Sequence, residues 1–175
     1  MTDLRHLAAC YRLGLLDTES LVRMADTLLD EKRDTPAVIQ FSILESPVMA
    51  DAGPLFERVC SESGVAVPTT DEAIDELLRH RLESIASGHC PPREGLEAVM
   101  QEICPHFAAE PCKAHVGDSR GMQHLIGAFW SHGDLVDRPH EVSWDGKHGA
   151  EAIARWEECV RQYARDWLQK HDQVA

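Results

Sequence analysis

The chain has 175 residues, of which 43% are hydrophobic and 27% are charged, and its formal net charge at pH 7 is −13. These proportions are those of a globular protein and argue against global disorder. The acidic balance disfavours generic binding to nucleic acid or to an anionic membrane, because both present phosphate groups. It is compatible with a basic protein partner, since complementary charge accelerates the encounter. The alternative is that the charge only keeps the protein soluble.

The cysteines and the N-terminal sequence indicate the compartment. Six cysteines are scattered along the chain, and none belongs to a CxxC pair. The sequence begins with a polar segment rather than a signal peptide, and no apolar run approaches the roughly 20 residues of a membrane span. These features predict a cytoplasmic protein whose thiols stay reduced and are mostly buried.

The first half of the chain predicts short helices with clear start and stop signals. Apolar residues recur at helical spacing over residues 4–11, and Gly14 is expected to end this first helix. Three further helix starts carry a capping residue or a proline in the first turn, at Asp17, Thr35-Pro36 and Ser46-Pro47. The second of these helices carries Ile39 and Ile43, and Gly64 is expected to cap the end of the third.

A short extended linker, Val65–Pro68, is expected to separate these helices from the next group. Thr70 then begins the clearest helix of the chain, with acidic residues in its first turn and an apolar face that runs to Ile85. Gly88 ends this helix. A further helix is expected over residues 91–103, because two prolines mark its start.

Residues 104–149 interrupt the helical pattern. One helix is expected around residues 122–129, but Ser131–Gly149 is rich in glycine, proline, histidine and aspartate and predicts a long loop. Val142-Ser143-Trp144 adds at most a small strand. The final helix, residues 150–172, carries a wide apolar stripe.

The chain as a whole predicts an all-α fold, a single-domain bundle of about seven or eight short helices. A helical scaffold at 1–103, an irregular Cys/His/Trp-rich segment at 104–149 and the C-terminal helix at 150–172 form one domain, 1–175. Trp156 and Trp167, which share the stripe of the last helix, are expected in the core.

Six of the ten histidines lie between His106 and His148, and two cysteines stand beside them. Cysteine and histidine together are the usual ligands of zinc. The best candidate set has the spacing C-x-H-x5-C-x2-H and comprises Cys104, His106, Cys112 and His115. Because this spacing matches no standard zinc motif, the alternative is that the cysteines fill apolar gaps while the histidines lie at the surface. No cofactor is expected outside this zinc alternative.

Four histidines also repeat every eight residues: His124, His132, His140 and His148. A continuous helix would place the first two on roughly one face. Gly133 and the later glycines and prolines disfavour a helix beyond Ser131, so the equal spacing is interpreted as accidental. No nucleophile elbow, Walker A loop or dinucleotide-binding fingerprint is present, and no catalytic residue is predicted.

Acidic residues dominate the stretch from Glu57 to Glu76, which holds six acids against Arg58 alone. This charge predicts a docking patch for a basic partner, and tryptophans outside the stretch are candidates for aromatic contacts. The predicted partner contacts are Glu72, Asp75, Glu76, Trp130 and Trp144. The alternatives are a solvated helix face for the acids and core packing for the two tryptophans.

These features predict an acidic, cytoplasmic protein-binding domain. Its size, charge and helical content are those expected of an immunity- or antitoxin-like inhibitor that occludes a basic partner. The alternative is a zinc-binding domain or a metal-dependent enzyme that uses the segment from Cys104 to His148. A third hypothesis is a subunit of a homo-oligomer, held together through the apolar final helix.

Overall fold

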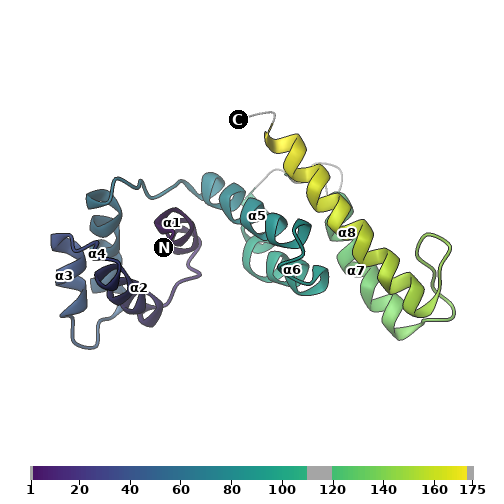
Figure 1. Ribbon diagram of the computed structural model, residues 1–175, viewed down its shortest axis with the longest axis horizontal. Coiled ribbons are helices and arrows are strands. Elements are labelled where there is room, and N and C mark those ends of the chain that lie inside the picture. Colours follow the sequence, from purple (N-terminus) through teal and green to yellow (C-terminus); the bar gives the residue numbers. More distant parts are fainter. Residues whose placement is uncertain (1, 110–119, 173–175) are drawn as a thin grey trace. The chain divides into compact units, whose positions relative to one another are not determined.

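The computed structural model describes residues 2–109 and 120–172, and these residues contain eight α-helices (Figure 1). The predicted all-α class is confirmed. The helices are Leu4–Arg12 (α1), Thr18–Asp30 (α2), Pro36–Ser42 (α3), Met49–Glu62 (α4), Thr70–Ala86 (α5), Pro92–Ala98 (α6), Gln123–Asp137 (α7) and Gly149–Asp172 (α8). A π-helical turn at Val99–Ile103 and a 3₁₀ turn at Cys104–Ala109 follow α6.

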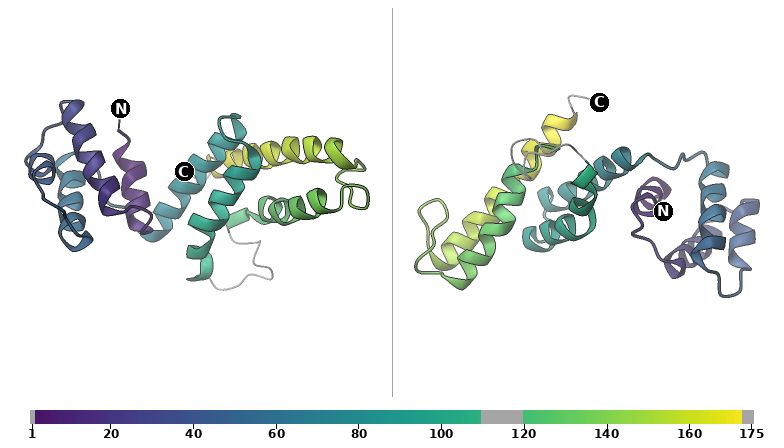
Figure 2. Two further views of the ribbon diagram at one scale, coloured as in Figure 1. Left: turned by 90° about the horizontal axis from the view of Figure 1, so that it is seen from below. Right: turned by 180° about the vertical axis from the view of Figure 1, so that it is seen from behind.

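The helices gather into two compact units, residues 1–77 (unit 1) and residues 78–175 (unit 2). Helices α1–α4 belong to unit 1 and α6–α8 to unit 2, and both groups can be followed in two further views (Figure 2). The expectation of one domain over the whole chain stays a prediction. In neither described range is a helix both long and apolar enough to cross a membrane.

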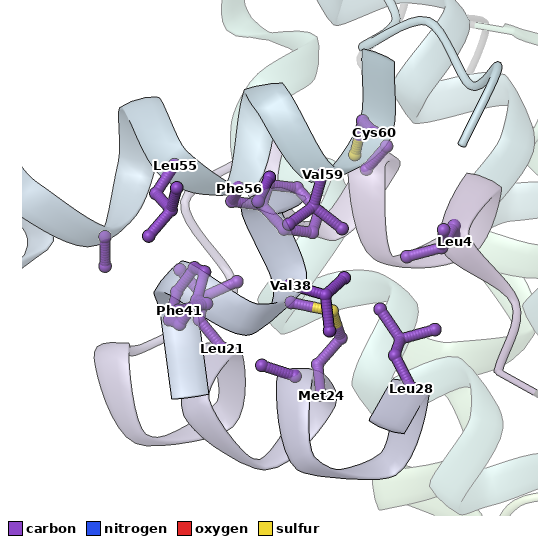
Figure 3. Close-up of a cluster of buried hydrophobic side chains, with 14 residues drawn as sticks. Leu4, Leu21, Met24, Leu28, Val38, Phe41, Leu55, Phe56, Val59 and Cys60 are labelled. Atoms are coloured by element: carbon purple, nitrogen blue, oxygen red, sulfur yellow. The ribbon is translucent and has the colours of Figure 1, made fainter. Parts of the chain in front are cut away.

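The core of unit 1 is formed by α1–α4 and is mainly aliphatic (Figure 3). Leu21 and Leu28 on α2, Phe41 on α3 and Phe56 on α4 are fully buried. Cys60 lies in the same core, where burial raises the pKa of its thiol to about 11. This cysteine therefore packs as a small apolar side chain.

Capping residues determine where two helices of unit 1 begin. Asp17 accepts a hydrogen bond from a backbone amide of α2 at 2.7 Å, and Thr35 accepts one from α3 at 3.4 Å. Both predicted caps are confirmed, since each satisfies an amide that has no partner within its helix. The start predicted at Ser46-Pro47 is wrong, because α4 begins at Met49 with Val48 as its N-cap residue.

Helix α3 is also held by its neighbour α4. Glu62, at the end of α4, accepts a hydrogen bond from the Ala37 amide in the first turn of α3 at 2.8 Å. This bond and a second one from Thr35 hold the pKa of the Glu62 carboxyl below its usual value. A carboxylate at a helix N-terminus is stabilising, so Glu62 ties α3 and α4 into one hairpin.

Unit 2 is organised around the antiparallel pair α7 and α8, against which α6 packs (Figure 1). Trp156 on α8 is fully buried, and its indole N–H donates a hydrogen bond of 2.8 Å to the Ala128 carbonyl. The indole of Trp167 donates one of the same length to the Arg120 carbonyl. Both tryptophans are buried, as predicted.

Two glycines of unit 2 have opposite surroundings. A Cβ atom at Gly95 would lie 2.4 Å from Cγ1 of Ile85, so α6 approaches α5 at a point where only glycine fits. A Cβ atom at Gly127 in α7 would meet nothing within 4 Å. Packing therefore requires the first glycine and not the second.

The loop predicted from Ser131 begins later than expected. Helix α7 continues without a break through Gly133 to Asp137. Leu135 is buried on its inner face, and the free energy of that packing outweighs the low helix propensity of glycine. The loop between α7 and α8 therefore covers only residues 138–148.

Two of the equally spaced histidines lie on the side of α7 that faces α8. The ring of His124 stacks on Tyr163 with centroids 5.2 Å apart, and the ring of His132 lies 4.5 Å from that of Trp156. Burial and the nearby charge of Arg93 lower the pKa of His132. The assumption that no helix joins these two histidines is wrong.

The loop between α7 and α8 contains a tight turn in place of the predicted small strand. Trp144 and Lys147 form an isolated antiparallel bridge. Asp145 and Gly146 between them have positive φ angles of 50° and 73°, which is the geometry of a two-residue hairpin turn. This turn follows from the Asp-Gly pair, which adopts positive φ more readily than other sequences.

Candidate protein-docking surfaces

Apolar side chains are exposed at the turn between α3 and α4. Six large hydrophobic residues stand out as exposed in the described ranges, and four of them lie within residues 39–49. These four, which we call the apolar patch, are Ile39 (48% exposed), Ile43 (72%), Val48 (59%) and Met49 (39%). Single exposed hydrophobic residues are ordinary, whereas a local group of them is typical of an interaction surface.

Helix stability does not explain why an apolar residue stands at the start of α4. Val48 is the N-cap residue of α4, and no side chain caps the helix there. The side-chain oxygen of aspartate, serine or threonine at this position would accept a hydrogen bond from a backbone amide of α4 and stabilise the helix by roughly 1 kcal/mol. The preceding turn also contains Ser46 with a φ angle of +48°, a conformation that non-glycine residues rarely adopt. Such departures from local rules are expected where a surface serves recognition.

A groove of about 410 Å³ lies between α3 and α4, and we call it the α3–α4 groove. Its lining residues are Gln40, Leu44, Ala50, Asp51, Pro54, Leu55 and Arg58. Arg58 spans one part of the groove, because its guanidinium donates to Gln40 at 2.9 Å and pairs with Glu62 at 3.5 Å. The groove therefore combines apolar side chains with a carboxylate and a guanidinium that is already engaged.

The charge of the protein is concentrated in unit 1. This unit has fifteen acidic and six basic residues, a net charge of −9, whereas unit 2 has fifteen and eleven, a net charge of −4. Around the apolar patch, Glu45 and Asp51 are exposed. The apolar patch thus lies on the more acidic of the two units.

The predicted acidic contacts also lie in unit 1. Glu72 and Glu76 border a second groove of about 450 Å³ beside Gly64 and the linker 65–68, and Asp75 is exposed on α5. The Glu72 carboxylate accepts bonds from the amide and the hydroxyl of Thr69, both at 2.8 Å, and these bonds lower its pKa. Glu72 therefore caps α5, a role that the spacing of the two residues could have indicated. Partner contact by these three acids stays a prediction.

The two predicted tryptophan contacts lie in unit 2. Trp130 is 66% exposed on α7, with the Phe129 ring edge-on at 5.2 Å, so the core alternative is wrong for it. Trp144 is half-buried in the turn before α8, and Arg155 of α8 donates to the adjacent Asp145 at 2.8 Å. Neither tryptophan belongs to the apolar patch, and their role as partner contacts stays a prediction.

Two of the four predicted zinc ligands, Cys112 and His115, lie outside the described residues. Cys104 is half-buried with its thiol 3.6 Å from the Met100 sulfur, and burial raises its pKa to about 11. His106 is half-buried in the same 3₁₀ turn. No group of three metal-binding side chains occurs in the two described ranges, and zinc stays a sequence-based prediction.

Ser87 and His89 form a contact that the sequence did not indicate. The Ser87 hydroxyl lies 2.6 Å from His89 Nδ1 and donates to the Glu83 carbonyl at 2.7 Å. The hydroxyl has one hydrogen and therefore donates to one of these two groups at a time. The bond to the carbonyl four residues earlier is the usual back-bond of a serine at the end of a helix, and no third group that orients the His89 ring is seen among the described residues.

A comparison with known proteins gives no match among family models, curated proteins or solved structures. The function is therefore inferred from the surfaces described above.

Proposed function

We propose that this protein acts by binding another protein and that the apolar patch of unit 1 makes the central contact. The observation that carries the proposal is the concentration of exposed aliphatic side chains at the α3–α4 turn. Burial of such side chains against a partner removes apolar surface from water and stabilises the complex. The net charge of unit 1 adds a preference for a basic partner, because opposite charges accelerate association.

The protein in this proposal is an acidic binding domain of the cytoplasm. An immunity- or antitoxin-like inhibitor would use an apolar centre with acidic surroundings to occlude the basic surface of its partner. The apolar patch takes the central position in place of the contacts predicted from sequence, and Glu72, Asp75 and Glu76 add long-range attraction. Trp130 remains a candidate for a separate contact in unit 2.

Site-specific photo-crosslinking tests the proposal. A photoreactive phenylalanine analogue replaces Ile43, and the variant is expressed in the cell that makes the protein. We expect a discrete covalent adduct with a second, basic protein, because a bound partner excludes water from this position. The same analogue in place of Val136, an exposed residue of unit 2, is the matched control and should give little of this adduct.

The crosslinked protein, once identified, is then purified and its affinity for the chain is measured. Ile43→Ser should weaken binding by about tenfold, equivalent to roughly 1.4 kcal/mol, while Val136→Ser should leave binding unchanged. Equal adduct yields at both positions, or adducts with the chain itself alone, would contradict the proposal.

A further inference from the structure

We infer that the partner segment that docks on the α3–α4 groove and the apolar patch is an amphipathic α-helix whose apolar stripe is flanked by lysine or arginine. This inference rests on the proposed function and adds the secondary structure and the charge of the docking segment. It depends on three features of unit 1, namely the spacing of the groove residues, the continuity of the groove with the core, and the charge around it.

The walls of the groove have helical spacing. On α4, the lining residues Asp51, Pro54, Leu55 and Arg58 follow the spacing i, i+3, i+4 and i+7, which places them along one face. On the opposite side, Gln40 in α3 and Leu44 in the turn after it are four residues apart. A third helix packs its side chains into the groove between two such rows.

An extended partner strand fits this site less well. Strand addition requires a row of backbone N–H and C=O groups that point sideways along an edge. The walls of this groove are helices, whose backbone groups point along the helix axis and present no such row. Recognition at the groove must therefore come from side chains. A helix presents side chains at the matching period of 3.6 residues.

The apolar surface of the groove is continuous with the core of unit 1. Leu55 is buried in that core, and Leu44 is half-buried against it. Ile43 and Met49 stand at the exposed side of the same turn. An apolar stripe of a docked helix would thus extend the existing core rather than rest on an isolated side chain, which is how helix-in-groove complexes bind.

The charge around the groove determines the rest of the partner's chemistry. The sequence from Asp34 to Glu57 contains four acidic residues and no basic one. No ion pair among the described residues uses Glu45 or Asp51, whereas Arg58 is engaged by Glu62. These carboxylates can pair with cationic side chains beside an apolar stripe. A second copy of this chain would oppose acid with acid, so self-association is disfavoured.

Three synthetic helical peptides of about 18 residues, or five turns, test the inference on the full chain. The first has a leucine stripe flanked by lysine, the second has the same stripe flanked by glutamate, and the third has the lysines with serine in place of leucine. At physiological ionic strength, fluorescence anisotropy should show the leucine-lysine peptide binding at least about tenfold more tightly than either other peptide.

Variants of the chain locate the binding. Ile43→Ser should weaken binding of the leucine-lysine peptide by about tenfold. The double variant Glu45→Lys with Asp51→Lys should instead bind the leucine-glutamate peptide more tightly than the leucine-lysine peptide. Val136→Ser and Asp137→Lys are the controls in unit 2, one for the loss of an exposed apolar side chain and one for the reversal of a single charge, and their affinities should stay within about twofold. Circular dichroism and the unfolding temperature confirm that each variant is folded.

Each contrary outcome has a defined meaning. Equal affinity of the serine-lysine and leucine-lysine peptides would show attraction by charge alone and would overturn the inference. The inference would also be overturned if Ile43→Ser left the affinity for the leucine-lysine peptide unchanged. It would be overturned too if the chain formed a dimer and Ile43→Ser dissociated that dimer. If all peptides fail while the crosslinked partner still depends on Ile43, only the partner's helical and cationic character is wrong. Loss of the crosslinked partner would overturn both the inference and the proposed function.

Discussion

The two units of this protein use their apolar residues differently. Unit 1 combines short helices with an aliphatic core and leaves four large aliphatic side chains exposed at one turn. Unit 2 contains all four tryptophans and nine of the ten histidines. It buries Trp156 with His132 between α7 and α8, and it buries Trp167 against the Arg120 carbonyl. Trp156, Trp167 and His132 thus serve the packing of unit 2, whereas Trp130 is exposed on α7. The recognition surface we propose uses ordinary aliphatic residues of unit 1.

The largest effect we expect would test whether the two cores fold separately. Trp156→Ala removes a fully buried ring and its bond to the Ala128 carbonyl, which should destabilise unit 2 by about 3–5 kcal/mol. Hydrogen exchange should show loss of protection in α7 and α8 while α2 and α4 stay protected. Equal loss of protection in both units would mean one cooperative unit, in agreement with the single domain predicted from the sequence.

Two alanine substitutions separate a glycine that packing requires from one that it does not. Gly95→Ala should destabilise unit 2 by about 1–3 kcal/mol, because its Cβ would collide with Ile85. Gly127→Ala should stabilise it by about 0.5–1 kcal/mol, since alanine favours the helix and meets no neighbour. Chemical denaturation measures both changes, and a Gly95→Ala variant that is no less stable than the native chain would contradict the packing described for α6.

One substitution should increase stability while it reduces binding. Val48→Ser provides the side-chain cap that α4 lacks and should stabilise unit 1 by about 0.5–1 kcal/mol. The same change removes an exposed valine of the apolar patch, so affinity for the partner or for the leucine-lysine peptide should fall. Thr35→Ala, which removes the cap of α3, is the control and should lower stability by a similar amount. If Val48→Ser left binding unchanged, the uncapped helix start would have no part in recognition.

The smallest effects concern pH and should differ between the units. The pKa of His132 in the folded chain is below its usual value of about 6.5, so the unfolded state binds protons more readily and unit 2 loses stability as pH falls below about 6.5. Glu62 also has a lowered pKa, and the stability it contributes is present above about pH 4.5 and is lost as pH falls through the folded value. Hydrogen exchange across a pH series should show unit 2 weakening first.

Matched variants check the assignment of these two pH effects. His132→Gln should flatten the pH dependence of unit 2 near pH 6. Glu62→Gln should reduce that of unit 1 in acid, where Glu72 keeps its own contribution. A pH dependence of unit 2 that persists in His132→Gln would assign it to another group.

The sequence was sufficient for features that depend on neighbouring residues. The caps at Asp17 and Thr35 and the linker at Val65–Pro68 follow from local chemistry, and the structure contains them. Helix α7 illustrates the limit of such reasoning, because Gly133 disfavours a helix locally while the burial of Leu135 stabilises it. The length of α7 is therefore determined by contacts with residues that are distant in the sequence.

The apolar patch could not be identified from periodicity alone. Ile39 and Ile43 have helical spacing and mark the helix in the sequence, yet α3 buries Ala37, Val38 and Phe41. A seven-residue helix that is apolar on two faces can bury only one of them against α2 and α4. The choice between the faces depends on the tertiary arrangement. The presence of a second apolar face, formed by Ile39 and Ile43, was the one feature of the sequence that pointed to an exposed apolar surface. It could be interpreted in this way only once the first face was known to be buried.

The burial of Cys60 gives unit 1 an internal chemical reporter. A thiol whose pKa is about 11 and whose side chain is fully enclosed reacts with an alkylating reagent only when the surrounding helices separate. Its alkylation rate in the native chain therefore counts openings of α4 from α1–α3 without any engineered label. Because a docked partner helix would lie across α3 and α4, the same rate should slow when the partner binds. Mass spectrometry of the peptide that contains Cys60 could thus follow both partner binding and the local stability of unit 1.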